Sequence, residues 1–192
     1  AAHVEDGYTS TVPMGLDEML RRCTAVWRGT KRCFLVGDAP FGSTEESSEQ
    51  AVRTAVQFIR HGCHAVKLEG ASPSRLRAIR AIADAGILVM GHVGLTPQGR
   101  AKFGGYVVQG RTPEAAAEIV EDAKAAELAG VSLLLVEAVP PSVGKRIAEA
   151  VEVPVIGVGA GPHVDGQCLI VHDALGLFRD FKPKFAKRYL EG

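Results

Sequence analysis

Short apolar segments alternate with amphipathic segments along most of this chain, and that alternation restricts the fold more than any other feature. Segments with the composition of buried strands lie at 33–42, 65–70, 87–94, 132–140, 153–161 and 168–176. Helical periodicity occupies 16–29, 49–62, 74–86, 112–130 and 142–151. Strands that alternate with helices of this length are joined by right-handed crossovers and pair in a parallel sheet. Both an open sheet and a barrel satisfy the pattern.

Side chains capable of chemistry stand at the carboxyl ends of the expected strands: Asp38, Glu69, His92, Glu137 and Asp173. In a (β/α)8 barrel these ends meet at one mouth, where the active sites of that fold are found. We therefore predict a single (β/α)8 TIM barrel domain over residues 1–192. Six strands are expected here, whereas a complete barrel has eight and typically about 250 residues. The first two strands are accordingly expected to be missing from this sequence.

The overall charge and the cysteines exclude several classes of function. Lys plus Arg and Asp plus Glu both number 22, so the formal net charge is zero and nothing favours nucleic acid or an anionic membrane. No apolar run approaches the roughly 18 to 20 residues that cross a bilayer. Cys23, Cys33, Cys63 and Cys168 lie far apart, without the spacing of a zinc site. We expect reduced thiols and a cytoplasmic protein.

The segment "HAVKLEG" at 64–70 places two charges where a buried strand should be apolar. Lys67 and Glu69 share one face of that strand because side chains alternate, and uncompensated charge in an apolar interior is costly. In one interpretation, Asp38 and Glu69 hold Mg²⁺ through carboxylate oxygens, and Lys67 binds an acid substrate or a developing enolate oxygen. In the other, Lys67 only neutralises one of the acids. The spacing alone does not decide between them.

Glu137 is the candidate general base. It follows four apolar residues at 133–136, a setting that removes water from a carboxyl group and raises its pKa. An ion pair with a neighbouring strand's Lys or Arg is the alternative. His92 either faces a ligand or orients its loop, and the second is favoured. His172 and Asp173 either belong to the site at the barrel mouth or cap the next helix, and the sequence does not decide between these roles.

The glycines of "GVGAG" at 157–161 are spaced to let a ligand approach the backbone. The spacing is not G-x-G-x-x-G, and the residues that follow do not open an obvious helix. Dinucleotide binding is therefore not expected.

Seven segments of the chain, taken in order, resemble the ketopantoate hydroxymethyltransferase family: "GDAPFGS", "VKLEG", "GHVGLTPQ", "FGGYVVQGR", "VEAVP", "VIGVGAG" and "DGQCLIVHDALG". "GYTSTVPMGLDEML" and "PKFAKRY" are also similar to family segments, so the resemblance covers nearly the whole chain. It implies transfer of a hydroxymethyl group from 5,10-methylenetetrahydrofolate to 3-methyl-2-oxobutanoate through a Mg²⁺-stabilised enolate. The product is 2-dehydropantoate, in pantothenate biosynthesis. The resemblance also implies a (β/α)8 barrel in a large homo-oligomer, a decamer in the family.

The resemblance assigns roles to the residues already singled out. Asp38 in "GDAPFGS" would ligate Mg²⁺ and approach the substrate. Lys67 in "VKLEG" would bind the substrate, and Glu69 in the same segment would act on the metal side. Glu137 in "VEAVP" would be the proton acceptor that removes the C3 proton. His92 in "GHVGLTPQ" falls among the substrate-binding residues of the mouth.

The sequence departs from the family in several places. The upstream "GDS" segment, whose Asp is a metal ligand and whose Ser contacts substrate, is expected to be missing, as is the final helical tail. Ala39, Thr44 and Ala71 replace the usual Leu, Tyr and Gly.

Two other functions remain open at this point. One is a Mg²⁺-dependent keto-acid lyase of the related phosphoenolpyruvate/pyruvate barrel group. The other is an inactive fragment that only associates with full-length subunits. Product analysis with and without methylenetetrahydrofolate separates the lyase from the transferase, and sedimentation of the isolated chain tests the fragment.

Overall fold

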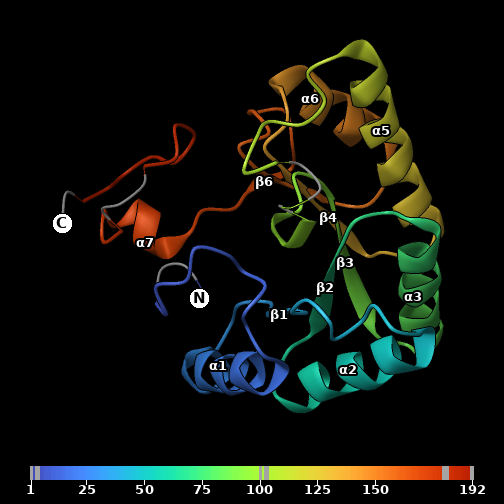
Figure 1. The fold of residues 1–192 in the computed structure, drawn as a ribbon, viewed down its shortest axis with the longest axis vertical. Helices are drawn as coiled ribbons and strands as arrows, with labels where there is room; N and C mark the ends of the chain where they lie inside the picture. Colours follow the sequence, from blue (N-terminus) through green and yellow to red (C-terminus); the bar gives the residue numbers. More distant parts are fainter. Residues whose placement is uncertain (1, 3–4, 100, 102–103, 179–181, 191–192) are drawn as a thin grey trace.

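One parallel sheet of six strands forms the centre of the part of the chain that the structure describes (Figure 1). The structure is a computed structural model and describes residues 2, 5–99, 101, 104–178 and 182–190. Each strand is parallel to the next in chain order, with the bounds β1 Val36–Asp38, β2 Ala65–Glu69, β3 Leu88–Gly94, β4 Leu133–Glu137, β5 Val155–Val158 and β6 Gly166–Gln167. This order and pairing are those of a (β/α) barrel, here a partial barrel.

The longer helices lie in an arc around the strands (Figure 1). Their bounds are α1 Leu16–Gly29, α2 Ser48–Arg60, α3 Pro73–Asp84, α5 Pro113–Leu128 and α6 Pro141–Ala150. The helix expected at 16–29 has those bounds, and the other expected helices are confirmed to within two residues at each end. No helix among the described residues is long and apolar enough to cross a membrane.

Side-chain caps fix where several helices begin. Thr112 accepts a hydrogen bond from the backbone N–H of Ala115 at 3.2 Å, and Pro113 opens α5, as predicted. Ser47 and Ser72 cap α2 and α3 in the same way. The cap of α3 follows the end of β2 after only two residues, so α3 starts close to the carboxyl end of that strand.

The two faces of the sheet differ in chemistry. Val66 and Leu68 are 0% and 1% exposed and belong to the main core between the sheet and the helices. On the inner face, Met90, Leu135 and Val158 form a second, smaller apolar cluster. The polar residues of the strands therefore stand on the inner face, near the carboxyl ends, as the alternation in β2 predicts.

The prediction of a last strand at 168–176 is wrong. Pairing with β5 continues only from Gly166 to Cys168, whose backbone N–H donates to the Gly157 carbonyl at 2.9 Å. β5 ends at Val158 and Gly159 turns the chain with φ +63°, so no partner remains for a longer ladder. The chain instead forms the short helix α7 (Val171–Ala174), and α7 rather than a strand end holds His172 and Asp173.

Candidate active site

Four adjacent strands, β1 to β4, bring four charged side chains and one imidazole to the same level of the sheet: those of Asp38, Lys67, Glu69, Glu137 and His92. Asp38 is the last residue of β1 and pairs in register with Lys67 of β2. Glu69, the last residue of β2, pairs with His92 of β3. Glu137, the last residue of β4, pairs with Gly94 at the end of β3. The register thus gathers the residues expected at the strand ends, Asp173 excepted.

Lys67 is the centre of this cluster. Its Nζ lies 3.1 Å from Oδ1 of Asp38 and 3.7 Å from Oε1 of Glu69. The side chain is only 12% exposed. Burial alone would lower the pKa of the ammonium, but the charges of Asp38 and Glu69 reverse the effect, and the net pKa is raised. Lys67 is therefore a fixed positive charge.

His92 lies next to both Lys67 and Glu137. Its Nδ1 lies 3.4 Å from Lys67 Nζ, and its Nε2 lies 3.3 Å from Oε2 of Glu137. The ring is fully buried, and burial together with the charge of Lys67 lowers its pKa to about 3. The imidazole is therefore neutral at pH 7. Because an ammonium can only donate, Nδ1 is the accepting nitrogen and the ring proton is on Nε2, facing Glu137.

Glu137 has the electrostatic setting of a general base. Its side chain is 20% exposed, and burial raises its pKa to about 7 against the opposing effect of Lys67. The next residue, Ala138, has a φ of +49°, which is rare for a residue with a side chain. A side chain at Gly94 would come within 2.4 Å of the Glu137 carbonyl oxygen, so this position requires glycine. The backbone around Glu137 is closely constrained.

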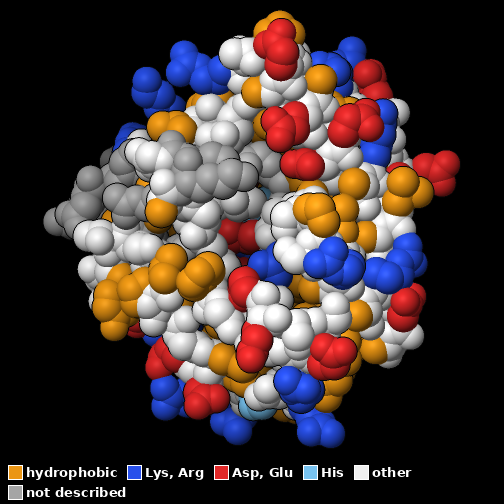
Figure 2. Space-filling model, turned by 45° about the vertical axis from the view of Figure 1, so that its right-hand side comes forward, with side chains coloured by type: hydrophobic (Ala, Val, Ile, Leu, Met, Phe, Trp, Pro, Cys, Tyr) orange, Lys and Arg blue, Asp and Glu red, His pale blue; other side chains and the backbone are white. Residues whose placement is uncertain are grey.

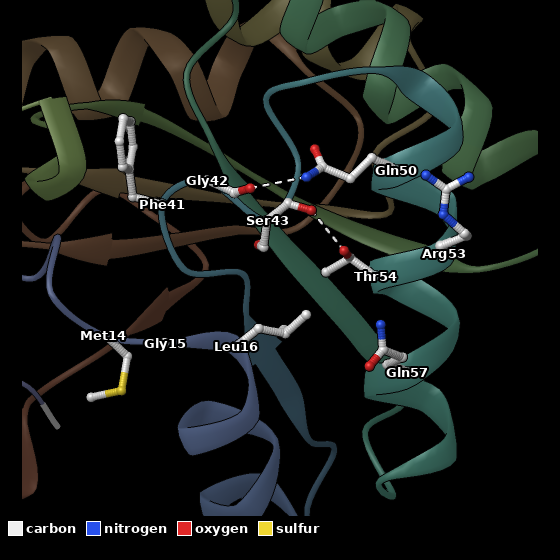
Figure 3. Close-up of a pocket in the computed structure, with 10 residues that line it drawn as sticks. All are labelled: Met14, Gly15, Leu16, Phe41, Gly42, Ser43, Gln50, Arg53, Thr54 and Gln57. Carbon is white, nitrogen blue, oxygen red and sulfur yellow. Dashed lines mark hydrogen bonds between the residues drawn. The ribbon is translucent and has the colours of Figure 1, made fainter.

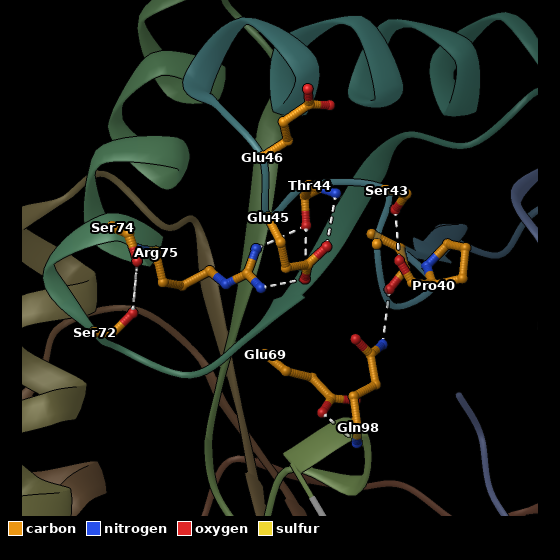
Figure 4. Close-up of polar contacts among 12 residues, drawn as sticks. Pro40, Ser43, Thr44, Glu45, Glu46, Glu69, Ser72, Ser74, Arg75 and Gln98 are labelled. Atoms are coloured by element: carbon orange, nitrogen blue, oxygen red, sulfur yellow. Dashed lines mark hydrogen bonds and ion pairs between the residues drawn. The ribbon is translucent and has the colours of Figure 1, made fainter. Parts of the chain in front are cut away.

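Gln98 contacts Glu69, at the end of β2, and Ala39, directly after β1. Gln98 is not among the site residues predicted from the sequence. It lies in the 3-10 turn η1 (Pro97–Gly99), and its backbone N–H donates to Oε2 of Glu69 at 2.9 Å. Its side-chain Nε2 donates to the Ala39 carbonyl oxygen at 2.8 Å. Figure 4 shows Gln98 between Glu69 and the segment that holds Pro40. The motif "GHVGLTPQ" contains this residue, but nothing in its sequence indicates these distant partners.

The acidic pair offers oxygen ligands that suit a hard divalent cation. Asp38 is 46% exposed, and Glu69 is 6% exposed. Across the described ranges, no group of three or more His, Cys, Asp or Glu side chains is arranged to hold a metal. Mg²⁺ commonly takes one or two carboxylates and completes its shell with water and substrate oxygens. The donor set fits such a cation, with the remaining ligands supplied from outside this cluster.

Figure 2 shows a hollow near the middle of one face, with acidic side chains inside it and a basic side chain beside them. A cavity of about 360 Å³ is lined by Gln98, Gly104, Gly105 and, from the N-terminal segment, Ser10 and Val12. Because Gln98 also contacts Glu69, this cavity borders the acidic cluster.

A second cavity of about 410 Å³ lies between α1, α2 and the loop after β1 (Figure 3). Its polar lining is largely paired within the protein, since Gln50 donates to the Gly42 carbonyl and Thr54 to the Ser43 carbonyl. Arg53 is the ionisable residue among those that line it. Without an acid–base pair among the described residues that line it, this cavity is a poor site for chemistry, and the acidic cluster is the better candidate.

His172 and Asp173 lie in α7, which Figure 1 shows apart from the ends of β2, β3 and β4. Asp173 is 6% exposed, and burial raises its pKa. Phe103 of the segment "FGGYVVQGR" lies outside the described residues. Neither α7 residue is part of the acidic cluster.

The fold and this cluster define a class of protein: a (β/α) barrel protein with a candidate acid–base site at the carboxyl ends of its strands. The sequence model described as ketopantoate hydroxymethyltransferase matches residues 1–192. The chain belongs to the ketopantoate hydroxymethyltransferase family.

Curated relatives agree with that assignment. The chain is 48% identical over 194 residues to 3-methyl-2-oxobutanoate hydroxymethyltransferase 2, mitochondrial, of Oryza sativa subsp. japonica, covering 98% of this chain and 49% of the relative. It is 47% identical over 184 residues to 3-methyl-2-oxobutanoate hydroxymethyltransferase of Syntrophomonas wolfei subsp. wolfei, covering 95% and 66%. The chain thus spans between about half and two thirds of the length of these two relatives.

Solved structures bear on the fold alone. The 2,3-dimethylmalate lyase described as a PEP mutase/isocitrate lyase superfamily member has a TM-score of 0.58 at 16% identity, covering 81% of this chain and 55% of that chain. A phosphonopyruvate hydrolase complex with oxalate and Mg²⁺ has a TM-score of 0.59 at 15% identity, covering 82% and 60%. The predicted fold class, a (β/α) barrel, is confirmed, here as a partial barrel.

Proposed function

We propose that this chain carries the active site of a 3-methyl-2-oxobutanoate hydroxymethyltransferase. The reaction transfers a hydroxymethyl group from 5,10-methylenetetrahydrofolate to 3-methyl-2-oxobutanoate and yields 2-dehydropantoate for pantothenate biosynthesis. It begins with loss of a proton from C3 of the keto acid. The observation that carries the proposal is Glu137, a buried carboxyl group with a pKa of about 7 that contacts the neutral His92, in a chain of this family. A base with a pKa near the working pH suits this step.

Each residue of the cluster has a proposed role. Glu137 accepts the C3 proton at a carboxylate oxygen. Lys67 presents its ammonium to the carboxylate of the substrate, or to the oxygen on which negative charge develops, in a site of low dielectric. His92 is fully buried, and its neutral ring separates Lys67 from Glu137. It therefore prevents a direct ion pair, which would lower the pKa of the base.

Asp38 and Glu69 are the residues proposed to hold Mg²⁺. A bound Mg²⁺ would act as a Lewis acid that draws electron density from the ketone of the substrate. A solved structure of similar fold, phosphonopyruvate hydrolase, is described as a complex with oxalate and Mg²⁺, which supports a divalent cation at this kind of site. Asp38 is exposed enough to exchange a cation with solvent, and Glu69 is held in place by the backbone N–H of Gln98.

Deuterium exchange at C3 of 3-methyl-2-oxobutanoate in D₂O, followed by proton NMR, tests the proposed roles. We expect exchange that requires Mg²⁺ and that Glu137→Gln abolishes. The matched control is Glu118→Gln, which makes the same chemical change at an exposed residue of α5 and should exchange like the unchanged chain. Circular dichroism establishes that each variant is folded.

Three results would contradict the assignment. Exchange that survives in Glu137→Gln would remove Glu137 as the base. Exchange that is unaffected by a chelator would remove Asp38 and Glu69 as metal ligands. A folded chain without any exchange would refute the proposal that the cluster in this chain enolises the keto acid.

Product analysis separates the transferase from a keto-acid lyase. With methylenetetrahydrofolate present, the transferase forms 2-dehydropantoate, whereas a lyase consumes its keto acid with or without the folate. The family assignment supports the transferase.

We also propose a homo-oligomer in the cytoplasm, with no nucleic-acid or membrane partner. Sedimentation of the isolated chain tests the oligomer. Because the rice relative is named as mitochondrial, the compartment needs a direct localisation experiment.

A further inference from the structure

Two acidic side chains at the ends of neighbouring strands lie beside the same ammonium group, that of Lys67. The positions of their carboxylates also depend on the loops that follow the strands. Asp38 is followed at once by the loop between β1 and α2, which begins with Ala39. Glu69 lies at the end of β2 with its carboxylate 6% exposed. A buried carboxylate of this kind needs hydrogen-bond donors. The donors that reach it decide where it points.

Gln98 supplies one of those donors and also binds the other loop. Its backbone N–H reaches Glu69 Oε2, 29 residues away, and its side chain reaches the Ala39 carbonyl, 59 residues away. Pro97 precedes it and fixes the backbone of the turn, and Gly99 N–H closes the turn on the Thr96 carbonyl at 2.8 Å. One residue therefore connects the ends of three neighbouring strands.

We propose that Gln98 is a positioning residue that ties the carboxylate of Glu69 to the segment directly after Asp38, so that the two acids keep a fixed separation. Without the side-chain amide, the turn η1 loses its attachment to Ala39 and the N–H at residue 98 moves away from Glu69. Use of that separation to bind a divalent cation rests on the proposed function.

The rest of the loop after β1 is held by other contacts, which makes the role of Gln98 testable. Gln50 of α2 donates from its side chain to the Gly42 carbonyl at 3.0 Å, as Figure 3 shows. Arg75 of α3 donates to Thr44 at 2.7 Å and pairs with Glu45 at 2.5 Å (Figure 4). These contacts hold the middle of the loop to the helices. Gln98, by contrast, connects the start of the loop, at the Ala39 carbonyl, to the carboxylate of Glu69.

Gln98→Met and Gln50→Met form a matched pair of variants. Both keep the size of the side chain and remove an amide that donates to a carbonyl of the same loop. Gln50→Met also loses the bond that Gln50 accepts from the backbone N–H of Glu46, so it is the stricter control for general loosening. Gln98→Asn keeps the amide but is too short to span the same gap, and it serves if Gln98→Met does not fold.

The first measurement needs neither metal nor activity. Amide hydrogen exchange by NMR on the metal-free chain should show at least tenfold faster exchange at residue 98 in Gln98→Met, with no change there in Gln50→Met. Calorimetric titration with Mg²⁺ should then show a Kd about tenfold weaker in Gln98→Met, the scale found when the outer partners of metal ligands are removed. In Gln50→Met the Kd should stay within about twofold of the unchanged chain.

The two measurements separate failure of this inference from failure of the proposed function. Unchanged protection at residue 98 in Gln98→Met, or equal weakening of Mg²⁺ binding in both variants, would overturn the role of Gln98. If the unchanged chain does not bind Mg²⁺, the proposed metal ligands are wrong, and the exchange experiment alone decides whether Gln98 positions Glu69.

Discussion

Replacing Glu137 by Gln should make the stability of the chain less sensitive to pH in a predictable direction. The pKa of Glu137 is raised from its ordinary 4.5 to about 7 in the folded chain because the group is buried. Between these values the folded state keeps a proton that the unfolded state has released. Stability therefore falls as pH rises from about 4.5 to 7 and is level above that range. Glu137→Gln removes this titration.

The size of the effect follows from the same values. A difference of one pH unit in pKa corresponds to about 1.4 kcal/mol, so the full change for Glu137 amounts to roughly 3 kcal/mol. About 2.5 kcal/mol of it falls between pH 5 and pH 8. Relative to the unchanged chain, Glu137→Gln should gain about that much free energy of unfolding over this range.

Urea denaturation at several pH values measures the difference. The comparison must be made between variants, because His92 has a lowered pKa and contributes the opposite trend between about pH 3 and 6.5. Glu118→Gln at an exposed position should run parallel to the unchanged chain. A gap between Glu137→Gln and the unchanged chain that stays constant from pH 5 to pH 8 would refute the argument that burial sets the pKa of Glu137.

Lys67→Met should destabilise the chain by about 3 to 5 kcal/mol, because it leaves the buried carboxylate of Glu69 without its counter-charge. The loss should be larger at pH 8 than at pH 5, and urea denaturation at these two pH values tests this. Gly94→Ala should lower the free energy of unfolding by about 3 kcal/mol, since Gly94 has a φ of +89° and the new Cβ would lie 2.4 Å from the Glu137 carbonyl oxygen. Gly70 has the same φ but open space around it, so Gly70→Ala should lower it by only about 1 kcal/mol. Equal losses in the two glycine variants would mean that the contact with Glu137 is relieved by movement. Mg²⁺ at a hundred times its Kd should raise the free energy of unfolding by about 2.7 kcal/mol, and a chelator should reverse this; no shift on titration would count against the proposed metal site.

The pairing of Lys67 with Glu69 could be predicted from the sequence because it follows from local geometry. Residues two apart in a strand share a face, and the apolar residues between them identify the opposite face. Asp38 and Glu137 could be predicted as well, because the end of an apolar segment marks the end of a strand. The contact of His92 with Glu137 depends on the register between β3 and β4, which the sequence pattern does not fix.

Two other features lay beyond sequence reasoning for different physical reasons. The segment at 168–176 has the composition of a strand, but the neighbouring strand ends at Val158, and a strand cannot extend without a partner to accept its hydrogen bonds. Gln98 lies in a loop, and its partners are 29 and 59 residues away. Both features depend on tertiary contacts. The length of β5 limits the strand pairing at 166–168, and the packing of two loops against each other brings Gln98 to its partners.

The formal charges of the cluster give a separate argument for a cation at this site. Lys67 supplies one positive charge against the two carboxylates of Asp38 and Glu69, and the buried His92 is neutral at pH 7. The acidic pair already outweighs the ammonium before Glu137 ionises. A keto acid brings a further negative charge, and like charges in a site of low dielectric repel strongly. A divalent cation between Asp38 and the substrate would offset that excess, so binding of 3-methyl-2-oxobutanoate should depend on Mg²⁺ even in Glu137→Gln, where the base is absent.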